Sequence, residues 1–227
     1  MNRRAPELAL VTGLLLAVPI GGFALWATGD VSRSLLTGAG LSYPFAVYAV
    51  YHDDDPTTVL PPRAVAVAGG LLGAVPFADA VVADAALPGV VLRGAFLGLL
   101  VAAPAWAYAL GYGRAARLPD GRLSLAGAGV AGAALLLAGL LVGTPFGAAA
   151  ALVVWLTGAL AARSAGFRAT EDARLGAVGA GVVLGVALLF ATLLGGQTTA
   201  AAVLSAVTLA LAPAVYYGLT AETAAFE

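Results

Sequence analysis

Cysteine and lysine are both missing from this chain of 227 residues, and histidine and methionine occur once each. Without cysteine the chain has no disulfide, thiolate nucleophile, zinc–cysteine site or lipidated cysteine. Without lysine it has no Schiff base for retinal or pyridoxal phosphate and no P-loop lysine. The single histidine, His52, excludes a multi-histidine metal cluster within one chain. The sequence therefore predicts no cofactor and no metal centre that depends on these residues.

Charged residues are also scarce. They make up 10% of the chain, whereas hydrophobic residues make up 61% and the mean hydropathy is +0.98. A soluble domain is roughly 45–50% apolar and about 25% charged, so this chain is too apolar to be surrounded by water. The 11 basic residues, all arginine, nearly balance the 12 acidic ones, and no basic surface for nucleic acid is expected. The expected partner is a lipid bilayer.

Eight apolar stretches are long enough to cross that bilayer, since about 20 residues at a rise of 1.5 Å cover roughly 30 Å of hydrocarbon. The second stretch is short and contains Pro44, and the third contains Asp79. Losing both would leave six spans, which is the alternative. The sequence predicts an all-α, polytopic transmembrane helix bundle over a single domain, 1–227. The expected spans are 8–28, 35–51, 64–84, 90–112, 123–143, 146–162, 175–195 and 199–218.

The arginines predict the orientation of these spans. With the N-terminus inside, nine arginines lie on the cytoplasmic side, and Arg33 and Arg93 lie outside. An excess of arginine in short loops marks the cytoplasmic side. Six of the tyrosines lie toward the predicted inner ends of spans, where an amphipathic ring suits the membrane interface. We therefore expect a multi-pass protein of the cell membrane with both termini in the cytoplasm.

Two sequence patterns suggest a tandem helical-hairpin repeat. The segment 13–20 resembles 70–77 and 139–146. Each copy begins with Gly-Leu-Leu and has a proline as its seventh residue. Three even-numbered spans share a proline four residues before a tyrosine. These pairs are Pro44 and Tyr48, Pro104 and Tyr108, and Pro213 and Tyr217. Hairpins of one orientation would form a parallel repeat, with prolines at matching depths. Chance similarity in such an apolar sequence is the alternative.

Glycines four residues apart occur in several spans. They allow the close backbone approach on which helix packing in lipid depends. We expect them to pack helices within the chain, with a homo-oligomer or other membrane subunits as the alternative partners of these GxxxG faces. The pairs are Gly69 and Gly73, Gly94 and Gly98, Gly139 and Gly143, and Gly181 and Gly185.

An acidic run follows the second expected span: His52, Asp53, Asp54 and Asp55. Carboxylate oxygens suit Mg²⁺ or Ca²⁺, so the run is a candidate cation site. Consecutive residues rarely all face one ion, however, and Asp55 before Pro56 is also typical of a capped turn. We expect the second interpretation to hold.

A second candidate site consists of Asp79 and Asp84 in the third span and Arg93 in the fourth. An ionised aspartate at the bilayer centre costs about 2.5–3.5 kcal/mol, which makes such residues candidates for a proton relay or a cation site. Five residues of helix separate the two carboxylates by about 140° of rotation, so they do not form a pair. Arg93 could reach only one of them easily, and an interfacial ion pair between the adjacent helices is the simpler interpretation.

The residues needed by membrane enzymes are not present in suitable patterns. One loop histidine cannot supply a serine protease base within the bilayer or an HExxH metal site, so we expect no enzyme. Transport of a small solute or ion is the favoured function, and a structural or accessory subunit of a larger complex is the alternative. The excess of Ala, Val, Gly and Arg, with the run 52–55, resembles uncharacterised haloarchaeal multi-pass membrane proteins. That resemblance implies an archaeal cell membrane and no specific activity.

Overall fold

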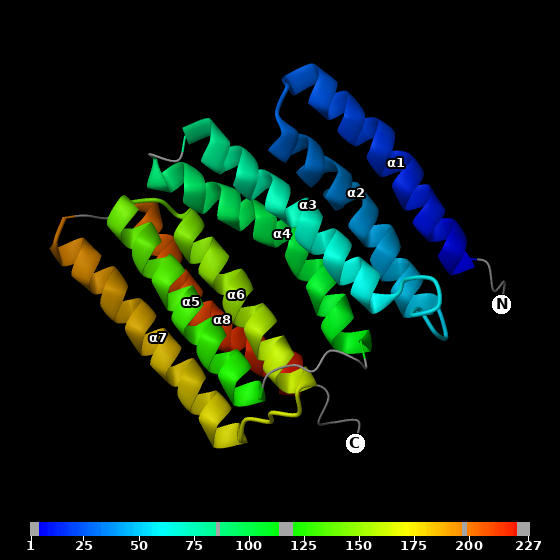
Figure 1. Ribbon diagram of the computed structural model, residues 1–227. Coiled ribbons are helices and arrows are strands. Elements are labelled where there is room, and N and C mark those ends of the chain that lie inside the picture. Colours follow the sequence, from blue (N-terminus) through cyan, green and yellow to red (C-terminus); the bar gives the residue numbers. More distant parts are fainter. Residues whose placement is uncertain (1–4, 85–86, 114–119, 197–198, 222–227) are drawn as a thin grey trace. The chain divides into compact units, whose positions relative to one another are not determined.

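Eight long helices make up the computed structural model, which describes residues 5–84, 87–113, 120–196 and 199–221 (Figure 1). No strand occurs within these ranges, and the prediction of an all-α bundle is confirmed. The helices are α1 (Ala5–Thr28), α2 (Val31–His52), α3 (Pro62–Asp84), α4 (Pro88–Tyr112), α5 (Gly121–Val142), α6 (Phe146–Ser164), α7 (Glu171–Leu194) and α8 (Ala200–Ala221).

Several helix boundaries follow from local capping. The Asp30 side chain accepts a hydrogen bond from the backbone N–H of Arg33 and so caps the N-terminus of α2. Thr170 caps α7 in the same way. At the C-terminus of α5, Gly143 has φ 75°, the left-handed conformation that glycine adopts without strain. Short, capped turns therefore separate the long helices.

Seven of the eight helices are long and apolar enough to cross a membrane. The exception is α2. Its 22 residues would be about 33 Å long, so its length is sufficient. Its hydroxyl groups, an arginine and a histidine make it more polar than the other helices. The structure thus has eight helices, as predicted. The second expected span, whose crossing was in doubt, corresponds to α2, the helix that is not apolar enough by itself.

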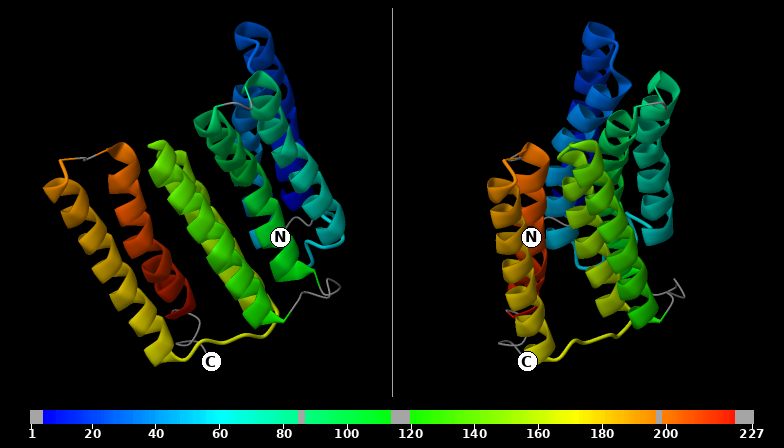
Figure 2. Two further views of the ribbon diagram at one scale, coloured as in Figure 1. Left: turned by 60° about the vertical axis from the view of Figure 1, so that its left-hand side comes forward. Right: turned by 90° about the vertical axis from the view of Figure 1, so that its left-hand side faces the viewer.

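The chain divides into two compact units, each of which is described by itself. Unit 1 comprises residues 1–84 and 97–114, and unit 2 comprises 85–96 and 115–227, so α4 contributes to both. In unit 1, α1 packs against α2, and α2 packs against α3. In unit 2, α5 pairs with α6, α7 pairs with α8, and α8 also contacts α5 and α6 (Figure 2). Both units are thus built from antiparallel helical hairpins.

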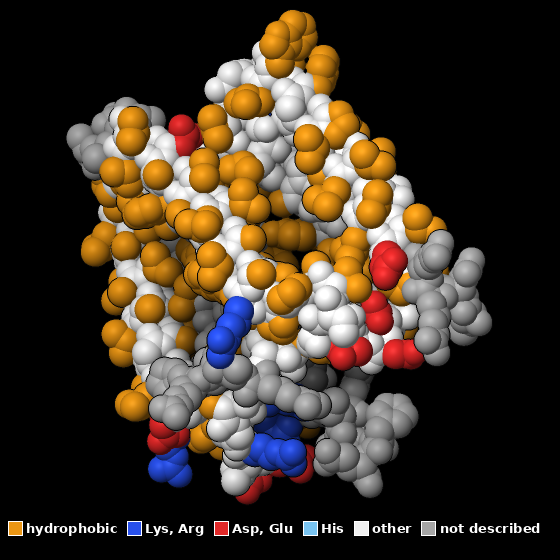
Figure 3. Space-filling view, turned by 45° about the vertical axis from the view of Figure 1, so that its right-hand side comes forward, with side chains coloured by type: hydrophobic (Ala, Val, Ile, Leu, Met, Phe, Trp, Pro, Cys, Tyr) orange, Lys and Arg blue, Asp and Glu red, His pale blue; other side chains and the backbone are white. Residues whose placement is uncertain are grey.

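Small residues form the interior, and large apolar residues lie outside. The buried residues of α6 and α8 are mainly alanines, such as Ala148 and Ala206. Leu141 and Leu194, by contrast, are 88% and 87% exposed. Apolar side chains cover most of the helix flanks in Figure 3, and charged side chains gather toward the helix ends. This arrangement suits a lipid environment, in which close van der Waals contact between backbones holds helices together.

Glycines make the closest of these contacts. A Cβ on Gly73 of α3 would lie 2.6 Å from the Gly98 carbonyl oxygen of α4. A Cβ on Gly185 of α7 would lie 2.6 Å from the Ala206 carbonyl oxygen of α8. Only a hydrogen atom fits at these positions. Gly73, Gly98, Gly181 and Gly185 thus pack helices within the chain. Gly143 instead follows the end of α5, where a Cβ would meet no atom within 4 Å, so Gly139 and Gly143 do not form a packing pair within one helix. Association with other chains through GxxxG faces stays a prediction.

The helix prolines lie at matching positions. In each of three even-numbered helices the proline precedes the last residue of the helix by eight positions. These residues are Pro44 and His52 of α2, Pro104 and Tyr112 of α4, and Pro213 and Ala221 of α8. The first two copies of the Gly-Leu-Leu segment lie inside α1 and α3. The third ends α5, and its Pro145 lies outside that helix. The third copy is therefore not equivalent to the first two.

Candidate functional site

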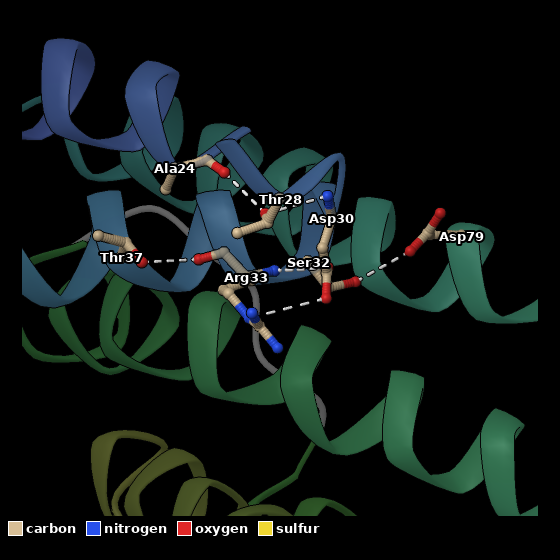
Figure 4. A network of polar contacts seen from close by, with 7 residues as sticks. All are labelled: Ala24, Thr28, Asp30, Ser32, Arg33, Thr37 and Asp79. Carbon is tan, nitrogen blue, oxygen red and sulfur yellow. Dashed lines mark hydrogen bonds and ion pairs between the residues drawn. The ribbon is translucent and has the colours of Figure 1, made fainter. Parts of the chain in front are cut away.

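Asp79 of α3 bonds to Ser32 of α2. The Ser32 hydroxyl donates to Asp79 Oδ2 over 3.1 Å, and Ser32 itself is only 8% exposed (Figure 4). The Asp79 residue is exposed and lies five residues before the end of α3. The contact links the beginning of α2 to the last turns of α3. It places the carboxylate near the end of the unit 1 helices, where an ionised group costs less than at the bilayer centre.

The turn between α1 and α2 adds further charges beside this contact. Arg33 Nε lies 3.9 Å from Asp30 Oδ2, and the Asp30 backbone N–H donates to Thr28 Oγ1 over 3.2 Å (Figure 4). Both charged side chains are accessible to solvent, so the ion pair contributes little stability. It does fix the position of a second carboxylate at the Asp79 end of unit 1.

The other members of the predicted Asp79 site are not brought to this contact. Asp84 is the last residue of α3, and its side chain lies outside the part of the chain that the structure describes. Arg93 is exposed and belongs to the stretch of α4 in unit 2. Its ion pair with Asp79 or Asp84 stays a prediction. Sequence reasoning missed Ser32, because a serine in an apolar helix gives no signal of a partner 47 residues away.

A pocket of about 300 Å³ lies among the helices of unit 1. The lining residues of α2 run from Ser34, three residues after the start of the helix, to Tyr43, twelve residues after it. The pocket therefore extends from about 5 Å to about 18 Å along α2. Figure 3 shows a hollow with apolar walls on this face of the molecule. Its lining residues are Ala17, Val18, Gly21 and Gly22 of α1, Ser34, Leu35, Gly38, Ala39, Ser42 and Tyr43 of α2, Leu72 of α3 and Val101 of α4.

The polar groups of this pocket are three hydroxyls, and each already donates its proton. Ser34 Oγ donates to the Gly21 carbonyl oxygen over 2.6 Å, and Ser42 Oγ donates to the Ala39 carbonyl oxygen over 3.2 Å. The Tyr43 hydroxyl donates to the Val101 carbonyl oxygen of α4. A hydroxyl that has donated its proton still has lone pairs to accept hydrogen bonds. The pocket thus presents hydrogen-bond acceptors.

A backbone carbonyl adds to these acceptors. Pro76 of α3 has no N–H, so the carbonyl four residues earlier, that of Leu72, lacks its usual partner within the helix. Leu72 is itself a lining residue of the pocket. Carbonyls freed in this way inside membrane proteins must be satisfied by another helix, by water or by a ligand. The described lining residues include no arginine, aspartate or glutamate.

The acidic run after α2 makes mostly local bonds. His52 Nδ1 donates to the Tyr48 carbonyl oxygen over 2.9 Å, and the two rings stack at 4.0 Å. Asp53 accepts from the Asp55 backbone N–H over 3.1 Å. Asp55 in turn accepts from the backbone N–H and hydroxyl of Thr57 over 3.2 and 2.6 Å. Asp54 is exposed. Among the described residues no group of three acidic or histidine side chains is arranged to hold a metal ion.

The loop that follows is tied to α4 by an aromatic side chain. The Tyr108 hydroxyl lies 2.7 Å from the Leu60 carbonyl oxygen and 3.2 Å from that of Pro56, and its single proton serves both acceptors. Trp106 Nε1 donates to the Ala66 carbonyl oxygen over 3.2 Å. Tyrosines near helix ends were predicted to form an interfacial belt. Tyr108 fixes the connection between α2 and α3 to the end of α4, and its place at a membrane interface stays a prediction.

Comparison with protein-family models, curated proteins and solved structures gave no match. The class of protein therefore rests on the helices themselves. Long apolar helices, small residues in the interior and large apolar residues outside define a multi-pass helical membrane protein.

Proposed function

We propose that the protein is a transporter-like membrane protein that moves a small solute by way of the pocket in unit 1. The pocket is the observation that supports this function. It extends along α2 from near one end to roughly the middle of a span, the depth at which many secondary transporters bind their substrates. Among its described lining residues no nucleophile is paired with a base, and no catalytic role is proposed.

The proposal requires α2 to cross the membrane with the other helices. Its polar side chains have partners inside the protein, which supports a crossing in spite of its polarity. Ser32 bonds to α3, Ser34 bonds to α1 and Tyr43 bonds to α4. A polar group costs little in lipid when its hydrogen bonds are made within the protein. Eight crossings would place both termini on the cytoplasmic side of the cell membrane.

Cysteine labelling tests this topology, because the natural chain has no cysteine to remove. Thr28 ends α1, just before the start of α2, and Asp54 follows the end of α2, and both residues are exposed. The variants are Thr28→Cys and Asp54→Cys. A membrane-impermeant maleimide added to intact cells should label Thr28→Cys at once and Asp54→Cys only after lysis. Labelling of both in intact cells would show that α2 does not cross.

The prolines of unit 1 supply a means of changing shape. Each of its helices has one proline beyond its first turn: Pro19 in α1, Pro44 in α2, Pro76 in α3 and Pro104 in α4. In unit 2 the helices α5, α6 and α7 contain none, and α8 contains Pro213. A proline weakens the hydrogen-bond ladder of a helix and favours a kink. We assign the moving part to unit 1 and the rigid part to unit 2.

Flux through reconstituted vesicles tests the transport proposal. Gly22 lines the pocket, and a Cβ there meets no atom within 4 Å, so Gly22→Leu should fill the pocket without a backbone clash. Gly40 of α2 is equally open and does not line the pocket, which makes Gly40→Leu the matched control. Uptake of small amines, polyols, amino acids and carboxylates would be measured in vesicles with each protein. Transport predicts saturable uptake of at least one solute that Gly22→Leu abolishes and Gly40→Leu preserves.

The aspartate at the end of α3 provides a second variant. Asp79 is not among the described residues that line the pocket, so it would act at the entrance rather than at the bound solute. Asp79→Asn keeps an oxygen that can accept from Ser32, and it should abolish flux while the protein stays folded. Uptake equal to that of the natural chain would remove Asp79 from the proposed function.

An accessory role has one observation in its favour. Gly176 and Gly179 of α7 lie on a face where a Cβ would meet no atom within 4 Å. Such a face allows the close approach of a helix from another subunit. Co-purification of a second membrane protein, lost in Gly176→Leu and Gly179→Leu, together with no uptake of any solute, would establish this alternative.

A further inference from the structure

We infer that the pocket of unit 1 binds a small primary ammonium ion that carries an apolar body. This inference rests on the proposed function for its biological role and names the class of solute. The first argument is the direction of the hydrogen bonds. Ser34, Ser42 and Tyr43 all donate to backbone carbonyls, so while these bonds are kept their oxygens accept hydrogen bonds from a ligand. A ligand that itself only accepts, such as a carboxylate or a ketone, would find no donor among these side chains.

Charge supplies the second argument. The described lining residues carry no charge of either sign, so the charges nearest the pocket decide which ion it favours. At the Asp79 end of unit 1, the carboxylate of Asp79 bonds to Ser32, two residues before the lining residue Ser34. The Arg33 guanidinium lies near the same end but faces the carboxylate of Asp30. A cation would pass this carboxylate and then exchange its hydration shell for hydroxyl and carbonyl oxygens, as cations do in other membrane proteins.

The size and lining of the pocket define the rest of the ligand. A volume of about 300 Å³ equals about ten water molecules in the liquid, so the ligand has at most about ten non-hydrogen atoms. The walls between the hydroxyls are apolar and suit a short alkyl chain. These wall residues are Ala17, Val18, Leu35, Leu72 and Val101. A primary ammonium offers three N–H donors at one end of such a chain.

Calorimetric titration of the full chain in lipid nanodiscs with n-butylammonium tests the inference. Three comparison compounds separate its parts: n-butyltrimethylammonium has the charge without N–H donors, butyrate is an anion, and 1-pentanol is a neutral donor. We expect n-butylammonium to bind at least about tenfold more tightly than each of them, as expected when a charged donor meets several acceptors.

A pair of variants on α2 locates the site. Ser42→Ala removes one acceptor from the pocket, and Thr37→Ala removes a hydroxyl that bonds within the helix in the same way but does not line the pocket. Loss of one hydrogen bond should weaken n-butylammonium binding about three- to tenfold in Ser42→Ala. Affinity in Thr37→Ala should equal that of the natural chain. An equal loss in both variants would overturn the assignment to this pocket.

The outcomes distinguish the ligand class from transport itself. Binding of n-butyltrimethylammonium, butyrate or 1-pentanol as tight as that of n-butylammonium would overturn the ligand class. Failure of n-butylammonium to bind would also overturn the ligand class. If another solute then showed uptake that Gly22→Leu blocks, the transport proposal would hold without this ligand class. Binding that Ser42→Ala weakens, without uptake of any solute, would support the ligand class and overturn transport.

Discussion

The hydroxyl of Ser32 donates a hydrogen bond to the carboxylate of Asp79 and thereby joins the start of α2 to the last turns of α3. Ser32 is almost fully buried, whereas Asp79 is exposed. The carboxylate therefore keeps access to its surroundings while one of its oxygens is held in place. An acidic residue near a helix end needs no function to explain it. The carboxylate of Asp79, however, is held by a buried hydroxyl and lies near a pocket whose hydroxyls all donate to carbonyls. This position suits it to attract a cation.

The contribution of this contact to stability can be separated from the charge. Ser32→Ala removes the donor and should lower the free energy of unfolding by about 0.5–1.5 kcal/mol. Asp79→Asn retains an acceptor oxygen and should change it by less. Equilibrium unfolding in mixed detergent micelles measures both, and the double variant gives the coupling between the two residues. A coupling of zero would show that the hydrogen bond contributes nothing to stability.

Two glycines of α7, two positions apart, should respond in opposite ways to alanine. A Cβ on Gly181 would lie 2.7 Å from Pro213 Cγ and would collide with the Leu209 carbonyl oxygen of α8. Gly181→Ala should therefore force α7 and α8 apart and destabilise the protein by about 1–3 kcal/mol. Gly179 faces open space, so Gly179→Ala should be neutral or stabilise the helix by up to about 1 kcal/mol. Thermal unfolding in detergent measures both. Equal effects would contradict the α7–α8 contact.

Two buried hydroxyls of α8 offer a similar contrast. Ser205 is 1% exposed, and its hydroxyl has no hydrogen-bond partner among the described residues. Ser205→Ala should stabilise the protein by up to about 1 kcal/mol, because a buried hydroxyl without a partner costs free energy. Thr208 Oγ1 lies 3.4 Å from the Ala148 carbonyl oxygen of α6, so Thr208→Val should destabilise the protein by about 0.5 kcal/mol. Stability in a detergent series distinguishes these signs. A loss in Ser205→Ala would reveal a partner for that hydroxyl.

Hydropathy was sufficient to predict the helices. A span of about 20 apolar residues has only one way to satisfy its backbone in lipid, so length and composition predict a helix directly. The second span was one of the doubtful ones in the sequence, and α2 is the helix that its polarity sets apart in the structure. Its Ser, Thr and Tyr residues lower its hydropathy, and the tertiary contacts that offset this polarity are invisible in a local window.

The candidate site shows where such prediction ends. Asp79 stood out because a charge is rare in a span, but Ser34, Ser42 and Tyr43 did not. A hydroxyl in a helix bonds to its own backbone by default, and only the positions of neighbouring helices reveal which hydroxyls line a pocket. The clustering of four hydroxyls, on Ser34, Thr37, Ser42 and Tyr43, within ten residues was the available signal. The acidic run 52–55 was more conspicuous in the sequence, and its side chains are engaged mainly in the local turn.

Tyr43 connects the pocket to the packing of unit 1, and its removal should affect both. Its hydroxyl donates to the Val101 carbonyl oxygen, and both residues line the pocket. Tyr43→Phe leaves a buried carbonyl without this donor and should lower the free energy of unfolding by about 1–2 kcal/mol. Tyr48 lies five residues later on α2 and is 46% exposed, so Tyr48→Phe is the matched control and should leave stability unchanged. Unfolding in mixed micelles measures both variants. If Tyr43→Phe proved as stable as Tyr48→Phe, the hydrogen bond between α2 and α4 would not hold the wall of the pocket. The acceptors of the pocket would then be the hydroxyls of Ser34 and Ser42 alone.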